Sequence, residues 1–245
     1  MLNKNNFINL IDKQQFYPTW LGIFINPFYF ARKGLLESVQ ALSPNIKGIT
    51  LDVGCGSKPY EKLFNSTEYI GLEIDTPNNR NFKKADYFYT GDILPFPDTF
   101  FDSVVSNQVF EHVFNPEFFL SEIHRVLKDD GTFLMTVPFV WDEHEQPNDY
   151  ARYSSFGIKF ILETNGFKII EHRKTMADIR TICQLINAYL YKVISPKTRR
   201  ANLITTFFFL SPFNILGEII YKILPKNDDL YLDNIILALK VKYNE

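Results

Sequence analysis

From residue 48 onward, short apolar segments alternate with stretches of helical character, and this alternation limits the chain to few folds. The segments are nearly continuous in apolar side chains, which is typical of parallel strands buried on both faces. They lie at residues 49–53, 69–73, 87–90, 101–106, 132–137, 167–172 and 235–241. Helices are expected at about 59–64, 116–127 and 154–164. Because a helix between two strands makes a crossover connection, the sequence predicts an α/β fold with a seven-stranded, mostly parallel sheet and helices on both faces.

Two regions fall outside this alternation. Residues 1–46 are rich in aromatic side chains and are expected to form an N-terminal helical cap, whereas residues 47–245 hold the main domain. Within that domain, residues 177–230 interrupt the pattern and are expected to form a helical insertion before the last strand. A length of 245 residues, 46% of them hydrophobic, is enough for one sizeable core, so one domain with an insertion is favoured over two domains.

Composition argues against several classes of protein. The formal net charge of −2 gives no sign of a nucleic-acid partner. Two cysteines, Cys55 and Cys183, are too few for a disulfide framework and favour the reducing cytoplasm. The first 13 residues lack the apolar core of a secretory signal. The longest uncharged runs, 14–31 and 201–217, are interrupted by proline and asparagine, so neither is interpreted as a clean transmembrane span.

The most informative local pattern is the segment 51–57, Leu-Asp-Val-Gly-Cys-Gly-Ser. Gly54 and Gly56 allow a tight turn directly after a strand and let a ligand approach the backbone closely. A helix starting after the turn would add free N–H groups at the edge where open α/β sheets bind ligands. A dinucleotide is disfavoured, because its fingerprint needs a third glycine where Pro59 stands and because Asp52 would face phosphates. The carboxylate of Asp52 suits a ligand with a positive sulfonium and amino group.

This segment resembles motif I of the class I S-adenosylmethionine-dependent methyltransferases, and further matching segments follow in the family's order. They lie at residues 71–73, 91–98, 101–107 and 108–113. The resemblance covers about residues 45–175 and is closest to ubiquinone/menaquinone-type and small-molecule enzymes of the methyltransferase type 11 kind. It implies a Rossmann-like fold and S-adenosylmethionine as cofactor. The chain departs from the pattern at Ser57, where many relatives have a third glycine.

The resemblance also implies which residues hold the cofactor. Glu73 would accept hydrogen bonds from both ribose hydroxyls, with Asp75 as the nearby competitor. Asp92 would accept from the exocyclic amine of adenine, and Ile93 would pack on the ring. The complete expected set is Asp52, Gly54, Cys55, Gly56, Glu73, Ile74, Asp92, Ile93 and Asn107.

Two histidines are candidates for catalysis, because an alcohol acceptor needs its proton removed by a base. His112 follows the fourth strand and His144 follows the fifth. His144 is the preferred base, whereas His112 is a second candidate with an equally reasonable capping or supporting role. No metal site is expected, because no H-x-x-H or C-x-x-C spacing occurs.

The loop that carries His144, residues 138–153, is dense in polar and aromatic side chains. It resembles a segment of methyltransferases associated with polysaccharide and lipid-linked glycan genes. Asp149, Arg152 and Tyr153 are expected to orient the base or to bind the substrate. The alternative is that the loop is held together by its own salt bridges.

The insertion combines positive charge with apolar side chains. Between residues 179 and 217 there is no acid, and an apolar run follows the basic residues at 203–210. The basic residues are Arg180, Lys192, Lys197, Arg199 and Arg200. We expect peripheral contact with an anionic membrane through residues 179–224, at the inner face of the membrane, or a lid over a hydrophobic acceptor. The alternative is a helical hairpin packed on the sheet edge.

The sequence therefore predicts methyl transfer from S-adenosylmethionine to an oxygen or nitrogen of a small-molecule or lipid- or glycan-linked acceptor. One alternative is a catalytically silent scaffold that binds S-adenosylmethionine, and another is a nicotinamide oxidoreductase. Binding of S-adenosylhomocysteine would exclude the oxidoreductase, and turnover would separate the enzyme from the scaffold.

Overall fold

A computed structural model describes residues 4–242, without the side chains of residues 4–8 and 82. The chain forms two compact units. The helical unit takes the residues up to Glu37, Val140–Asp142 and Lys174–Asp233, and the sheet unit takes Ser38–Phe139, Glu143–Arg173 and the residues from Asn234 on. The helical unit thus combines the N-terminal helices with the insertion. A division into a cap of residues 1–46 and a domain of residues 47–245 stays a prediction.

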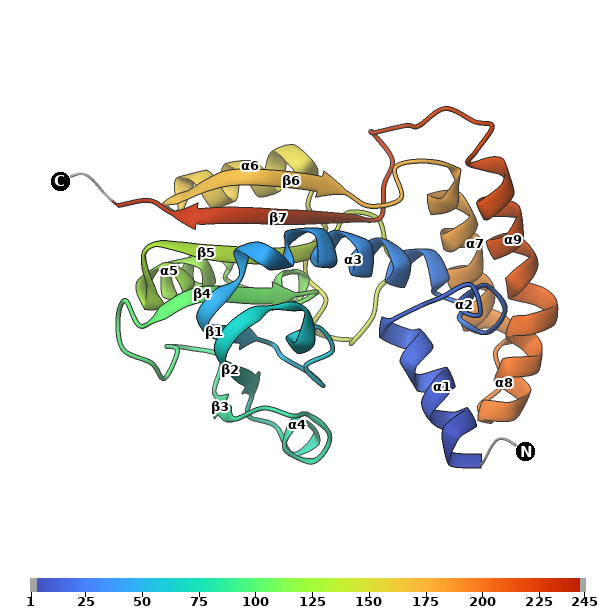
Figure 1. The fold of residues 1–245 in the computed structure, drawn as a ribbon, viewed down its shortest axis with the longest axis horizontal. Helices are drawn as coiled ribbons and strands as arrows, with labels where there is room; N and C mark the ends of the chain where they lie inside the picture. The colour runs from blue at the N-terminus through green and yellow to red at the C-terminus, as the bar shows by residue number, and fades with distance from the viewer. Residues whose placement is uncertain (1–3, 243–245) are drawn as a thin grey trace. The chain divides into compact units, whose positions relative to one another are not determined.

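All seven predicted strands are present and form one sheet in the order β3-β2-β1-β4-β5-β7-β6. They are β1 (Lys47–Val53), β2 (Asn65–Ile74), β3 (Tyr87–Tyr89), β4 (Phe101–Asn107), β5 (Leu127–Pro138), β6 (Phe167–Lys174) and β7 (Asp233–Lys240). The pairs β1–β2, β1–β4, β2–β3 and β4–β5 are parallel. In Figure 1 the arrow of β7 runs against its neighbours, so the sheet is mixed but mostly parallel, as predicted.

The core of the sheet unit forms because the central strands are apolar on both faces. Leu51, Val104 and Phe133 are completely buried in three neighbouring strands. The helices α5 (Pro116–Val126) and α6 (Ser155–Thr164) follow β4 and β5 and lie behind the sheet in Figure 1, with the end of α3 (Tyr29–Leu42) in front. Side chains at helical spacing on α5 and α6 complete the core, as the 3.6-residue period requires.

The prediction of a helix at residues 59–64 is wrong, because the structure has only the 3-10 turn η2 (Glu61–Leu63) there. The physical reason is that β2 begins at Asn65, where it already pairs with Lys47 of β1. A regular helix does not fit in so short a connection. The N–H groups beside the glycine turn therefore come from the turn itself and not from a following α-helix. Between β2 and β3 lies α4 (Pro77–Phe82), capped by the Thr76 hydroxyl.

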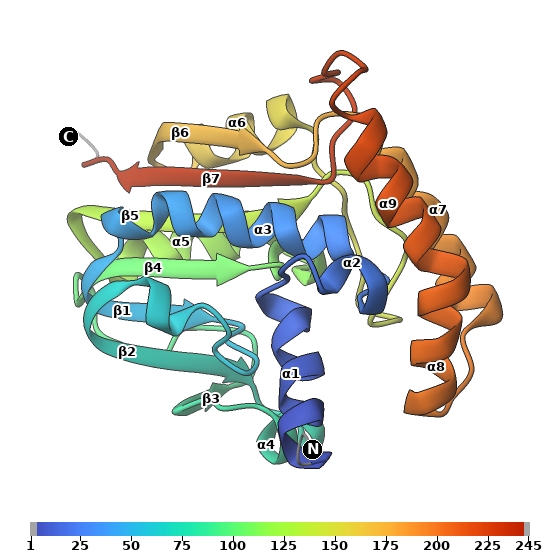
Figure 2. The ribbon, with the colours of Figure 1, turned by 45° about the vertical axis from the view of Figure 1, so that its right-hand side comes forward.

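The helical unit contains the predicted insertion as helices. The insertion forms α7 (Ile179–Ile194), α8 (Arg199–Thr205), the π-helical turn η4 (Thr206–Leu210) and α9 (Ser211–Ile220), and the N-terminal segment of the unit forms α1 (Lys4–Phe16) and α2 (Gly22–Ile25). Figures 1 and 2 both show α7 beside the long helix that α8, η4 and α9 make together. The core of this unit includes Tyr29, Phe30, Cys183 and Leu232.

Candidate functional site

The glycine turn after β1 has the conformation that its sequence requires. Gly54 has a φ of +72° and Gly56 a φ of +54°, which side chains other than glycine rarely adopt. A Cβ atom at Gly54 would lie 2.4 Å from Cγ2 of Val109, so the backbone also passes too close for a side chain. The N–H of Gly54 donates to the carbonyl of Leu72 at 2.9 Å, which fixes the turn against β2.

Glu73, at the end of β2, is the acid that faces the turn. Its Oε2 accepts a hydrogen bond from the N–H of Gly56 at 3.0 Å, and its side chain lines a cavity. The competitor Asp75 does not line this cavity, because its carboxylate binds the guanidinium of Arg80 at 2.6 and 2.7 Å. Of the two acids that the sequence left open, Glu73 is therefore the one placed to meet a ligand.

Asp52 and Cys55 are buried and do not line the cavity. The carboxylate of Asp52 accepts a hydrogen bond from the Tyr69 hydroxyl at 2.7 Å. Burial raises the pKa of Asp52 to about 7, although the bond from Tyr69 favours the ionised form. Burial likewise raises the pKa of the Cys55 thiol to about 12. Their predicted part in cofactor binding stays a prediction, and both residues shape the turn from within.

One cavity of about 750 Å³ continues from the glycine turn to the loops after β4 and β5. At the first end it is lined by Gly54, Glu73, Ile74, Tyr89, Gly91 and Asp92, and at the other by Gln108, His112, Phe114, Phe118, Glu145, Asn148 and Tyr150. Ile93 and Asn107, both expected at the cofactor, are absent from the lining. Ile93 is 67% exposed, and the buried Leu94 takes its place at the cavity wall.

The loop that carries Asp92 is held by two residues of α5 that the sequence analysis did not single out. Glu122 accepts a hydrogen bond from the N–H of Leu94 at 2.8 Å. Arg125 binds Glu122 with two nitrogens and also donates to the carbonyls of Leu94 and Phe96. A Glu and an Arg at i and i+3 look like an ordinary surface pair in the sequence, so only the fold reveals this role.

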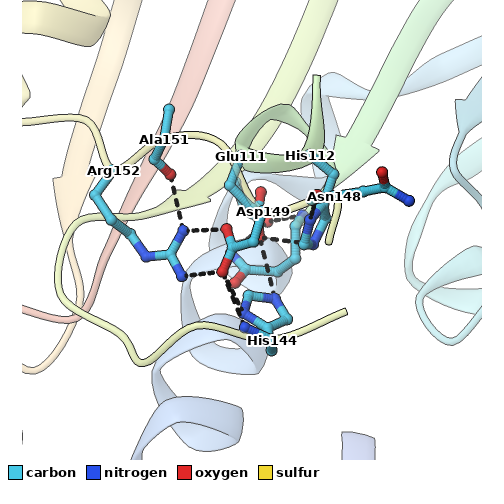
Figure 3. A network of polar contacts seen from close by, with 9 residues as sticks. Glu111, His112, His144, Asn148, Asp149, Ala151 and Arg152 are labelled. Carbon is cyan, nitrogen blue, oxygen red and sulfur yellow. Dashed lines mark hydrogen bonds and ion pairs between the residues drawn. The ribbon is translucent and has the colours of Figure 1, made fainter. Parts of the chain in front are cut away.

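At the other end of the cavity, three side chains from two loops converge (Figure 3). Oε1 of Glu111 lies 3.8 Å from Nε2 of His112 and 3.9 Å from Nε2 of His144. The two imidazole rings meet edge to face, with centroids 4.8 Å apart. Glu111 is completely buried, whereas both histidines are partly exposed. His112 lines the cavity, whereas His144 does not.

Asp149 and Arg152 hold this cluster from the side (Figure 3). Arg152 binds both carboxylate oxygens of Asp149, at 2.5 and 2.7 Å, and lowers the pKa of Asp149 to about 2. The same carboxylate accepts a hydrogen bond from the backbone N–H of His144 at 2.9 Å. Tyr153 packs against Phe110 in the core. None of the three predicted substrate-binding residues lines the cavity, so their direct contact with an acceptor stays a prediction.

The site contains three functional candidates that sequence reasoning missed. Gln108 lines the cavity with a φ of +55°, a conformation that costs energy for a side chain with a Cβ. Glu111 joins the histidines, and Tyr150 lines the cavity. The expectation of no metal site relied on spacing within one segment. It does not apply to Glu111, His112 and His144, because these potential ligands come from two segments that are far apart in the sequence.

The glycine turn, the buried acid at the end of β2 and the acid at Asp92 define a nucleoside-binding α/β protein. A family model described as a methyltransferase domain matches residues 51–135. An uncharacterized protein of Methanocaldococcus jannaschii is 30% identical over 163 residues, which cover 63% of this chain and 70% of that protein. A probable S-adenosylmethionine-dependent methyltransferase of Mycolicibacterium smegmatis is 47% identical over 133 residues, covering 49% of this chain and 51% of that protein.

Among solved structures, phosphoethanolamine N-methyltransferase 2 of Haemonchus contortus, bound to phosphomonomethylethanolamine and S-adenosylhomocysteine, is similar in fold. Its TM-score is 0.55 at 18% identity, and the match covers 98% of this chain and 58% of that chain. The chain belongs to the class I S-adenosylmethionine-dependent methyltransferases, and its cofactor is S-adenosylmethionine. The side-chain-free turn at Gly54 and the carboxylate of Glu73 facing the cavity fit this cofactor.

Proposed function

We propose that this protein transfers the methyl group of S-adenosylmethionine to an oxygen or nitrogen of a small acceptor. The observation that carries the proposal is the single cavity, which joins the glycine turn to His112 without a break. A donor and an acceptor bound at its two ends would be held next to each other, and such alignment supplies much of the rate of a displacement reaction.

Residues at the first end of the cavity suit the donor, which supplies a methyl group on a positively charged sulfur. Glu73 would accept hydrogen bonds from the ribose hydroxyls, and its bond from Gly56 holds its carboxylate in place. Asp92 lines the cavity and would accept from the adenine amine. Gly54 lines the cavity at the turn, where its backbone could contact the ligand directly.

The other end of the cavity suits an acceptor with an apolar body and one nucleophilic group. The aromatic side chains of Phe114, Phe118 and Tyr150 form part of its wall. His112 is the ionisable group of the cluster that reaches the cavity, whereas His144 does not line it. The sequence analysis preferred His144, whereas the lining favours His112 for contact with the acceptor.

Calorimetry with S-adenosylhomocysteine tests the donor half of this proposal. The wild-type protein and His112→Ala should bind it equally well, and no binding at millimolar concentration would refute the proposal. Turnover with a panel of small alcohols, phenols and amines tests the acceptor half. His112→Ala should lose turnover and the matched control His124→Ala, on the outer helix α5, should keep it. Donor binding with no turnover of any acceptor would instead favour the silent scaffold.

We also propose that the helical unit contacts an anionic membrane. Its long helices bury polar side chains and expose apolar ones, the reverse of what is usual in water. Thr206, Ser211 and Asn214 on the long helix are buried, as are Gln184 and Asn187 on α7. These polar groups bond to one another and to nearby backbone, for example from Asn187 to Asn214 at 2.9 Å. Polar contacts inside and apolar side chains outside are typical of helices packed in an apolar solvent.

The exposed face of the same helices is apolar. It carries Ile204, Phe207, Phe208, Phe209, Leu216, Ile219 and Ile223. The helix Arg199–Ile220 has 22 residues, and an 18-residue window of it has a mean hydropathy of 1.6 with 28% of that window buried. By length and composition alone, the helix could cross a membrane. The basic side chains of Lys197 and Arg200 are exposed at its start. We favour a helix lying in the membrane surface, with these charges on lipid phosphates, from which a lipid-linked acceptor could be reached.

Co-sedimentation with phosphatidylcholine vesicles, with and without phosphatidylglycerol, tests the membrane proposal. Binding should need the anionic lipid and weaken at high salt. The double variant Phe208→Ser with Phe209→Ser should bind at least about 10-fold more weakly, since each aromatic side chain contributes roughly 1.5–3 kcal/mol when buried. The control is Phe156→Ser with Phe160→Ser, two exposed aromatics on α6. Equal binding of both variants, or none by the wild type at low salt, would contradict it.

A further inference from the structure

Glu111, His112 and His144 present three metal-ligating atoms to one point. These atoms all lie within 4.8 Å of one another, and the distances from Oε1 of Glu111 to the two Nε2 atoms are 3.8 and 3.9 Å. Zinc and similar ions bind such ligands at about 2.0–2.2 Å, which corresponds to roughly 3.3–3.6 Å between ligand atoms in a tetrahedral site. Shifts of a few tenths of an ångström would bring the carboxylate oxygen to ligand distance from each nitrogen. The two histidine nitrogens, which lie within 4.8 Å of each other, would have to approach by up to about 1 Å.

The second nitrogen of each imidazole is engaged in the way that metal-binding histidines require. Nδ1 of His112 lies 2.7 Å from the carbonyl oxygen of Asn148. Because a carbonyl can only accept, Nδ1 carries the proton and the lone pair of Nε2 faces the cluster. Nδ1 of His144 lies 3.4 Å from Oδ2 of Asp149, which favours the same tautomer. Nε2 of each imidazole lies towards the carboxylate of Glu111 (Figure 3).

The residues around the cluster hold its ligands in place. Arg152 binds both oxygens of Asp149, and the same carboxylate accepts a hydrogen bond from the backbone N–H of His144. Glu111 is completely buried, and carboxylate oxygens and imidazole nitrogens are the ligands that zinc and similar ions take.

We propose that Glu111, His112 and His144 bind one divalent first-row transition-metal ion beside the acceptor end of the cavity. Two imidazole nitrogens and one carboxylate leave coordination positions open, as in catalytic rather than structural sites. Since His112 lines the cavity, an open position can face the acceptor. The two histidines then serve as ligands and not as the base.

This inference rests on the proposed methyl transfer and specifies how the acceptor is activated. Coordination lowers the pKa of a hydroxyl, so its proton leaves to solvent and its oxygen keeps the electron pair. That pair forms the new carbon–oxygen bond, while the bond between methyl carbon and sulfur breaks and its electrons stay on sulfur. No oxidant or reductant is needed.

Titration of the chelator-treated protein with Co²⁺, followed by calorimetry and visible absorption, tests the site directly. We expect one ion per chain and an absorption spectrum typical of bound nitrogen and oxygen ligands. His112→Ala and His144→Ala should each weaken binding by more than about 100-fold, and Asp149→Asn by about 10–100-fold, because it only orients a ligand. His124→Ala is the matched control, since its imidazole lies outside the cluster and bonds to the carbonyl of Val241.

Circular dichroism of each variant confirms that it is folded, and Glu111→Gln, which keeps the shape of the side chain, serves as a second ligand variant if an alanine variant unfolds. Absence of Co²⁺ binding, or equal binding by His124→Ala and by the ligand variants, would overturn the inference. Calorimetry with S-adenosylhomocysteine keeps the two proposals apart. Protein that binds this nucleoside but no Co²⁺ refutes the metal site alone, and protein that binds Co²⁺ but not the nucleoside refutes the methyl transfer.

Discussion

Asp52 should make the stability of this protein depend on pH in an unusual direction. Its carboxyl group is buried at the end of β1, and its pKa rises from 3.8 to about 7. Between these two values the folded protein holds a proton that the unfolded chain has released. Stability therefore decreases as the pH rises from about 4 through 7, and the loss is complete above that range. Replacement by asparagine removes the ionisation and keeps an oxygen that can accept the bond from Tyr69.

The size of the effect follows from the pKa. Each pH unit between 5 and 7 costs about 1.4 kcal/mol, so the wild type should lose roughly 3 kcal/mol of unfolding free energy relative to Asp52→Asn over this interval. Urea unfolding followed by far-ultraviolet circular dichroism at pH 5, 7 and 9 measures it. The comparison of the two proteins cancels the titration of groups that they share, the histidines included.

The hydrogen bond from Tyr69 gives a second check on the same reasoning. It favours the ionised form of Asp52, so Tyr69→Phe should raise the pKa of Asp52 further and extend the loss of stability to higher pH. If the stability difference between the wild type and Asp52→Asn is the same at all three pH values, Asp52 does not titrate as its burial requires, and the reasoning is wrong.

Other predictions concern the cavity walls and the loop behind them. Gly54→Ala should weaken S-adenosylhomocysteine binding at least about 10-fold in calorimetry, through a left-handed backbone worth about 1–2 kcal/mol and a clash with Val109. The effect should exceed that of Gly56→Ala, where a Cβ would meet only Nζ of Lys83, at 3.9 Å. Glu73→Gln should cost about 1.5–3 kcal/mol of nucleoside binding and leave Co²⁺ binding unchanged. Arg152→Ala should lower the thermal midpoint of unfolding and raise the pKa of Asp149 towards 3.8, as followed by carboxyl NMR.

The sheet could be predicted from the sequence because its strands are nearly continuous in apolar residues, a pattern that identifies buried parallel strands without knowledge of their neighbours. All seven predicted strands occur, and Gly54 and Glu73, which the sequence assigns to the cofactor, line the cavity. The prediction failed where a local pattern competed with strand pairing. Residues 59–64 have helical character, yet β2 starts at Asn65, because pairing with β1 outweighs the weak propensity of a short segment.

The acceptor end of the site could not be predicted in the same way. Its groups come from loops, and loop residues carry no period that shows which side chains point inward. The same holds for the loop at the cofactor end, where Ile93 is exposed and its neighbour Leu94 is buried. Glu111 also escaped the sequence analysis, since a lone glutamate after a strand looks like a solvated surface residue.

The loop after β5 contains two sets of residues with different contacts, and under the proposed methyl transfer this difference predicts which residues set acceptor specificity. His144, Asp149 and Arg152 bond to one another and hold the cluster, but they do not line the cavity. Glu145, Asn148 and Tyr150 line it. The backbone carbonyl of Glu111 accepts the N–H groups of Tyr150 and Ala151 at 2.9 and 3.2 Å, so the lining residues are positioned by the same residue that contacts both histidines. A change of acceptor is therefore expected from substitutions of the lining set, whereas substitutions of the holding set disturb the cluster for every acceptor alike.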